Sequence, residues 1–151
     1  MIRTVLAVVT IVAGAAVAGA QSNPLQERNE LMSTIWRNGL RPIMMMARGE
    51  EPYDKAKVQA SFTVLTDSVA KLPPLWPADS KPPQPPTTKF YSSSKIWDNK
   101  ADFNSWIDQL KKDISDNRTK ATANLEGLKI AFEAINKTCD GCHENYRLRA
   151  Q

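Results

Sequence analysis

The chain has 151 residues, with 20 Lys and Arg against 16 Asp and Glu, and a formal net charge of +4 at pH 7. The lysines are scattered and no basic run stands out, so the charge does not support binding to nucleic acid. A chain of this length is long enough for one domain with a core, and too short for two comfortable domains.

Residues 1–20 have the pattern of a secretory signal peptide. Arg3 is the single charged residue among them, residues 5–17 are an apolar run, and Ala18, Gly19 and Ala20 provide the small residues of a cleavage site. The alternative, a membrane-spanning helix, would need about 20 apolar residues, and this run is shorter. We therefore expect export, cleavage after Ala20, and a mature chain of 21–151 that is not embedded in a membrane.

The first helix of the mature chain is expected over about 24–48. Asn23 can cap its N-terminus and Pro24 suits the first helical position, while apolar residues recur at helical intervals along it. Pro42 should kink this helix without ending it.

The second helix is expected over about 54–72, where apolar residues alternate at spacings of four and three, and Pro73 and Pro74 end it. A long connection, about 73–95, follows and carries most of the prolines of the chain. Prolines lower the entropy cost of ordering a loop, so we interpret it as a packed crossover loop, with a partner-binding segment as the alternative. The third helix is expected over about 98–117.

The fourth helix, expected over about 121–148, carries one continuous apolar stripe. Its members follow one another at steps of three and four residues: Leu125, Leu128, Phe132, Ile135, Cys139, Cys142 and Tyr146. Both cysteines should therefore point into the domain. Because no alternating strand pattern occurs anywhere, we predict an all-α fold, an antiparallel four-helix bundle with a long Pro-rich loop between helices two and three.

The two cysteines stand in the motif Cys139-Asp140-Gly141-Cys142-His143. The pattern C-x-x-C-H is the attachment signal of c-type haem, since two thiols can add to the two vinyl groups of the porphyrin and the next residue can offer an imidazole to the iron. A thioredoxin-type dithiol would need a βαβ pattern, and a structural zinc site would need a fourth ligand. We predict one covalent haem c, held by Cys139 and Cys142, with His143 as an iron ligand.

A C-terminal C-x-x-C-H on the last helix of an exported four-helix bundle resembles the class II c-type cytochromes, the cytochrome c′ family. The resemblance covers essentially the whole mature chain. Residues 49–54 are similar to the family's junction between helices one and two, and residues 91–97 resemble the approach to helix three in its low-spin members. It implies a bacterial periplasmic electron-transfer protein, often dimeric, that exchanges electrons with redox partner proteins and uses His143 as its proximal ligand.

The family divides into two kinds of protein. Some members place an apolar residue on the other face of the haem, which leaves a five-coordinate iron that binds NO or CO, and others place a methionine there and carry electrons. Met32 lies about 12 Å from the start of helix one and His143 about 8 Å from the end of helix four, so antiparallel packing gives them the same depth. We predict that Met32 is the sixth ligand, with ordinary core packing as the alternative. The cluster 44–46 lies about 30 Å along the helix and is interpreted as core filling.

Counting from the other end of helix one gives a different answer. Measured from Gly49, the family's distal position falls on Ser33, and one inserted residue within the helix, near Trp36 or Pro42, would reconcile this count with Met32.

Arg28 precedes Met32 by four residues, and the resemblance implies a basic residue at this spacing that can meet a haem propionate. A solvated arginine is the simpler alternative. Ligation by His143 and Met32 would leave no vacant position for a substrate, which describes an electron carrier and not an enzyme. The competing interpretations are a five-coordinate protein that binds NO or CO, and a thiol–disulfide protein without haem.

Overall fold

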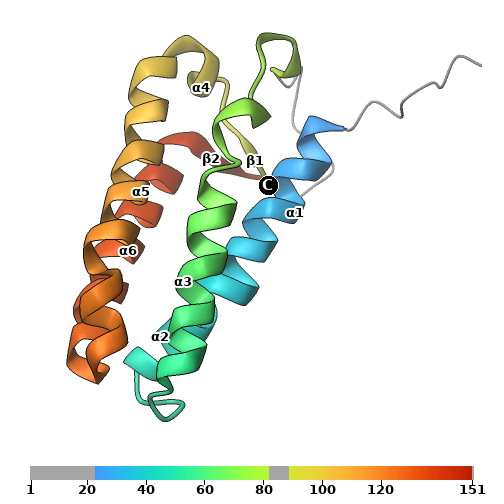
Figure 1. Cartoon of the computed structure of the whole chain (residues 1–151). Helices are drawn as coiled ribbons and strands as arrows, with labels where there is room; N and C mark the ends of the chain where they lie inside the picture. Colours follow the sequence, from blue (N-terminus) through green and yellow to red (C-terminus); the bar gives the residue numbers. More distant parts are fainter. Residues whose placement is uncertain (1–22, 82–88, 151) are drawn as a thin grey trace, which may run out of the picture.

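The computed structural model describes residues 23–81 and 89–150. Four long helical segments run antiparallel to one another in a single bundle, with α5 and α6 side by side and α3 beside the N-terminal helical segment (Figure 1). The prediction of an all-α four-helix bundle is confirmed. The predicted signal peptide, residues 1–20, and the prolines at 82, 83, 85 and 86 lie outside the described residues.

The first helical segment consists of three consecutive parts: α1 (Pro24–Thr34), the π-helix η1 (Ile35–Leu40) and α2 (Arg41–Ala47). It begins as expected, because the backbone N–H of Leu25 donates to Oδ1 of Asn23 at 3.0 Å. The prediction of one helix over 24–48 is confirmed in extent. The irregularity expected at Pro42 occurs in the turn before it, which is π-helical.

The second helix, α3 (Lys55–Val69), begins at Asp54, whose carboxylate accepts hydrogen bonds from the backbone N–H groups of Ala56 and Lys57. It ends three residues earlier than predicted, and two short 3₁₀ turns follow it, η2 (Pro73–Leu75) and η3 (Ala78–Ser80).

The last two long helices are α5 (Lys100–Ala123), which follows the one-turn helix α4 (Lys95–Asp98), and α6 (Leu125–Tyr146). The predicted boundary between them was wrong, because α5 continues to Ala123 and a single extended residue, Asn124, makes the whole turn. This turn is tight. A Cβ at Gly127 would lie 2.1 Å from the carbonyl oxygen of Lys120, so the close approach of the two helix ends requires glycine there.

Two three-residue strands were not predicted. Strand β1 (Phe90–Ser92) pairs antiparallel with β2 (Arg147–Arg149), with Tyr91 opposite Leu148. The fourth helix was predicted to reach 148, but it ends at Tyr146, where β2 begins. Strands this short carry no alternating pattern, and their partners are far apart in sequence. The pairing joins the end of the long connection to the end of α6 (Figure 1).

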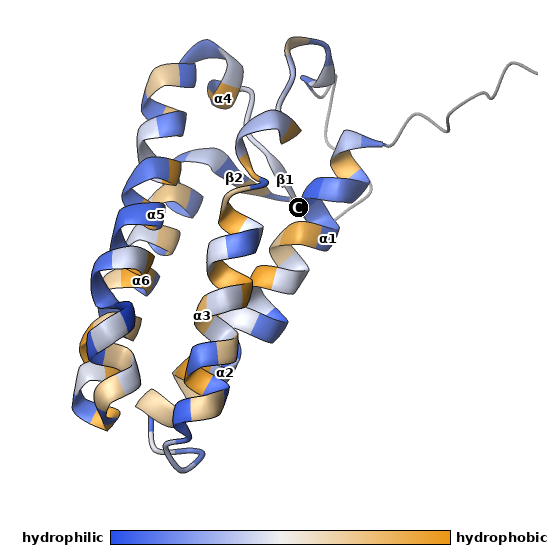
Figure 2. Cartoon of the chain, viewed as in Figure 1, coloured by the Kyte–Doolittle hydropathy of each residue, from blue (hydrophilic) through white to orange (hydrophobic). Residues whose placement is uncertain are grey.

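The core lies along the bundle axis, where the apolar faces of the helices meet (Figure 2). Its fully buried members include Ile43, Met46, Phe62, Leu128 and Ile135. Met46 therefore fills the core as expected, while Met44 and Met45 are half-buried. Within 23–81 and 89–150, no helix has both the length and the apolar character needed to cross a membrane.

Candidate functional site

A cavity of about 470 Å³ lies between α1, η1, α5 and α6. All five residues that the sequence analysis selected as site residues line it: Arg28, Met32, Cys139, Cys142 and His143. The three methionines at 44–46 do not line it. The structure therefore brings the predicted site together from two helices that are more than a hundred residues apart in sequence.

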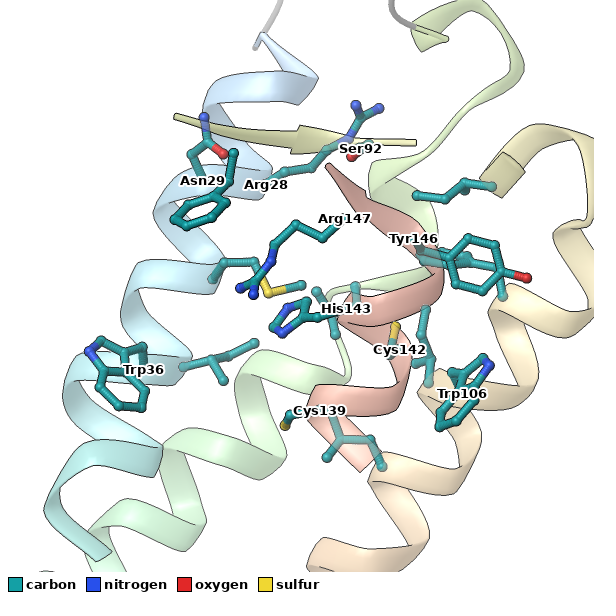
Figure 3. Close-up of a pocket in the computed structure, with 18 of the residues that line it drawn as sticks. Arg28, Asn29, Trp36, Ser92, Trp106, Cys139, Cys142, His143, Tyr146 and Arg147 are labelled. Atoms are coloured by element: carbon teal, nitrogen blue, oxygen red, sulfur yellow. The ribbon is translucent and has the colours of Figure 1, made fainter. Parts of the chain in front are cut away.

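The C-x-x-C-H motif forms one wall of the cavity from within α6. Cys139 and Cys142 are both half-buried and both are free thiols, so no disulfide joins them. The imidazole of His143 projects from α6 into the space between α6 and α1 (Figure 3). Helical spacing places these three residues on neighbouring positions of one helix surface.

Burial shifts the pKa values of the three side chains of this motif. It raises the pKa of the Cys139 thiol to about 12 and that of Cys142 to about 11, so both thiols are protonated at neutral pH. A redox-active dithiol depends on a lowered thiol pKa, so these values disfavour the thiol–disulfide alternative. Burial, assisted by the nearby charge of Arg147, lowers the pKa of His143 to about 4. The neutral imidazole has a free nitrogen lone pair for a metal.

Two carboxylates of α5 hold α6 on either side of the motif. The hydroxyl of Thr138, next to the first cysteine, donates to Oδ2 of Asp113 at 2.6 Å. The hydroxyl of Tyr146, three residues after the histidine, donates to Oδ2 of Asp102 at 2.5 Å. These bonds fix the rotation of α6 about its axis, and so the direction in which the motif faces.

Trp106 of α5 supports the middle of the motif by packing. A Cβ on Gly141 would lie 2.6 Å from Cη2 of the Trp106 ring, so glycine allows the indole to lie directly against the helix backbone. Trp106 also lines the cavity (Figure 3).

Arg28 is buried, with 4% of its surface exposed, so the interpretation of a solvated arginine was wrong. Its Nε donates to the carbonyl of Leu75 at 2.6 Å, a second guanidinium nitrogen donates to Oγ of Ser80, and the rings of Trp76 and Trp97 lie 5.3 and 5.4 Å away. Among the described residues, no carboxylate forms an ion pair with it. A buried cation without a counter-ion favours an anionic group nearby.

The opposite wall comes from α1 and η1. Met32 is half-buried there, and Ser33 also lines the cavity. Trp36, which is 44% exposed, lies on this side (Figure 3). Trp36 and Arg147 were not predicted as site residues. A signal was available for Trp36, because it lies four residues after Met32 in the same helical segment. Arg147 lies four residues after His143, but α6 has ended before it and Arg147 is the first residue of β2.

The residues present fit a haem. The cavity is within the usual size range of cofactor sites, about 300–1,000 Å³. Two free thiols three residues apart, a neutral imidazole and a thioether from the facing helix provide the attachment and ligand chemistry. Among the described residues, no group of three or more His, Cys, Asp and Glu side chains could hold a bare metal ion.

Comparison with known proteins gives the family. The family model described as Cytochrome C' matches residues 23–147. The chain belongs to the cytochrome c′ family. It is 35% identical to cytochrome c-555 of Bradyrhizobium diazoefficiens over 150 residues, which is 99% of each chain. Proteins of this family bind a covalent haem c with its iron, and this is the cofactor of the chain.

Solved structures agree with this assignment. The chain resembles cytochrome c′ from Rhodopseudomonas palustris with a TM-score of 0.76 and 27% identity, covering 87% of this chain and 100% of that one. It also resembles the NMR-validated structural model of oxidized cytochrome c556 from R. palustris, with a TM-score of 0.74 and 32% identity over 85% of this chain and 98% of that one.

Proposed function

We propose that this cytochrome is an exported, periplasmic one-electron carrier whose haem has two protein ligands. In this proposal Cys139 and Cys142 would hold the haem through two thioether bonds, and His143 and Met32 would be the two protein ligands of its iron. The observation that carries the proposal is that Met32 and His143 line the same cavity from facing helices.

When bound, a haem supplies reversible one-electron chemistry. The residues of the chain determine what this chemistry is used for. Two side-chain ligands, His143 and Met32, would leave no coordination position for a substrate, which suits a protein that carries electrons without binding another molecule at its metal. The sulfur ligand favours the reduced iron relative to a nitrogen ligand, which raises the reduction potential.

The remaining lining residues hold the cofactor in place. Leu40, Ile96 and Phe103 give the cavity an apolar surface that excludes water. Arg28 is available to neutralise a propionate, since its charge is buried and unpaired among the described residues. We expect redox partner proteins to exchange electrons with the haem. We also propose that two copies of the chain can form a homodimer.

One observation favours a second function. Ser33 lines the same cavity beside Met32, and a serine hydroxyl is a poor ligand for haem iron. If Ser33 faced the iron, the haem would be five-coordinate and would bind NO or CO.

The absorption spectrum of the purified protein tests the proposal. A low-spin ferrous spectrum that does not change on addition of CO is the expected result, because both axial positions are filled. A high-spin spectrum with immediate uptake of CO would favour the five-coordinate alternative.

A further inference from the structure

The π-helical segment η1 (Ile35–Leu40) interrupts the helix that carries Met32. At its end the backbone N–H of Arg41 bonds to the carbonyl of Trp36, five residues back, where an α-helix would bond four residues back. Such a turn contains one residue more than an α-helical turn. The extra residue is absorbed within the turn. The side chains of α1 and α2 therefore point in the same relative directions as they would in a regular α-helix that is one residue shorter.

The burial pattern agrees with this count. Ile35 and Leu40 are both buried, with 7% and 6% of their surface exposed. In a regular helix, residues five apart point about 140° away from each other and do not share a buried stripe. With one residue absorbed by the turn, the angle falls to about 40°.

The same residue count determines which side chain of α1 points in the same direction as the buried Leu40. Met32 lies eight residues before Leu40, which corresponds to about 80° in a regular helix and about 20° with the π-turn. Ser33 has the reverse behaviour, with about 20° in a regular helix and about 120° with the π-turn.

We propose that the π-turn Ile35–Leu40 selects Met32, and not Ser33, to face the haem iron. This inference rests on the proposed haem site. Its consequence is chemical, because a thioether binds haem iron and a serine hydroxyl leaves the position open. A single extra residue in a helix turn thereby decides whether the protein has the coordination of an electron carrier or that of a gas-binding protein.

Two residues keep the turn where it is. A proline ring in a regular helix collides with the carbonyl four residues back, so Pro42 disfavours regular helix over the preceding turn. Gly39 lies against α3, where an added Cβ would be 2.6 Å from Cδ2 of Leu65. The π-turn is therefore packed on the bundle and is not a frayed segment.

The alignment can be measured by moving a histidine along α1. In a Met32→Leu background, histidine is placed at position 31 or 33, and Met32→His is compared with both. The residue that faces the iron gives a low-spin, bis-histidine absorption spectrum, and the others do not. We expect this spectrum for Met32→His alone.

The same three variants are then made in a chain that lacks Asn38, an exposed residue of the turn, and carries Pro42→Ala so that a regular helix can form. Pro42→Ala alone is the matched control. Without the extra residue, Met32 is seven residues from Leu40, so a regular helix keeps it aligned and position 32 should again give the bis-histidine spectrum.

Several outcomes overturn the inference. Ligation by histidine at 33 in the full-length chain means that the helix is regular there. Ligation by histidine at 31 in the deleted chain means that the deletion of Asn38 rotated α1 by one residue. This is the result expected for a regular helix and not for the loss of the extra residue of a π-turn. Ligation at none of the three positions means that α1 does not face the iron. If the deleted chain does not fold by circular dichroism, the full-length comparison of 32 with 33 still decides.

These results are separable from the proposed function. An unmodified protein that is high-spin and binds CO, together with a bis-histidine spectrum for Met32→His, contradicts ligation by Met32 and keeps the alignment. A low-spin unmodified protein that is unreactive to CO, together with ligation by histidine at 33, contradicts the alignment by the π-turn and keeps the electron-carrier function.

Discussion

The two walls of the cavity are held by different kinds of contact. The α6 wall is a regular helix, fixed to its neighbour α5 by two short side-chain hydrogen bonds and by Trp106. The α1 wall is interrupted by the π-helix η1, and its buried Arg28 is tied to the connection after α3. The attachment side is thus built from contacts with an adjacent helix. On the opposite side, we propose that the number of residues in the turn η1 determines which residue of α1 faces the iron.

The largest expected effect breaks the α6 wall itself. Replacing Cys139 and Cys142 by alanine together should abolish covalent attachment, because no other thiol is present in the chain. Acid–acetone extraction of the denatured protein should then move all haem into the organic layer, while the unmodified protein and a Met44→Leu control retain it. Covalently retained haem in the double variant would contradict the assignment.

The second effect is the pH dependence of the stability of the haem-free protein, which arises from His143 on the α6 wall. Burial holds the folded-state pKa of His143 at about 4, below the ordinary 6.5, so the unfolded chain binds a proton that the folded chain does not. Stability should therefore fall as the pH drops from about 6.5 to about 4, by about 2–3 kcal/mol for this residue. Urea unfolding of the cysteine-free variant, with and without His143→Leu, measures the difference. Identical pH profiles for the two proteins would refute the effect.

A third effect sharpens the packing of the α6 wall. Gly141→Ala should lower the free energy of unfolding by about 1–3 kcal/mol, because the added methyl collides with Trp106. In a Trp106→Leu background the cost should shrink, and a double-mutant cycle by urea unfolding measures the coupling. Equal costs in the two backgrounds would mean that the two residues are not in contact.

The smallest expected effect is on a single hydrogen bond of that wall. Thr138→Val removes the donor to Asp113 while it keeps the shape of the side chain, and should cost about 1 kcal/mol of stability. Thr119→Val on the exposed surface of α5 is the matched control. We expect denaturant unfolding to show a larger loss for Thr138→Val than for the control.

The same contrast between the walls explains what the sequence could predict. The motif on α6 is local, so its residues and the inward direction of Cys139 and Cys142 followed from spacing alone. The burial of Arg28 did not, because its partners Leu75, Trp76 and Trp97 come from distant parts of the chain.

The helix boundaries and the strands show the same division. The turn at Asn124 was misplaced because the glycine that it requires, Gly127, does not lie in the turn itself but in the first turn of α6. The strands β1 and β2 pair only through the tertiary fold. On α1, counting residues from the two ends of the helix gave Met32 and Ser33 as alternatives. A one-residue insertion near Trp36 or Pro42 would reconcile them, and in our proposal the π-turn Ile35–Leu40 absorbs that residue.

The measurement that tests the central proposal most directly is CO binding by the ferrous Met32→Leu protein. This substitution removes the thioether at nearly constant volume, so the helices should remain intact by circular dichroism. We expect a high-spin ferrous haem that takes up CO, whereas the unmodified protein and a Met45→Leu control stay low-spin and do not react. A Met32→Leu protein that stays low-spin and unreactive would contradict ligation by Met32.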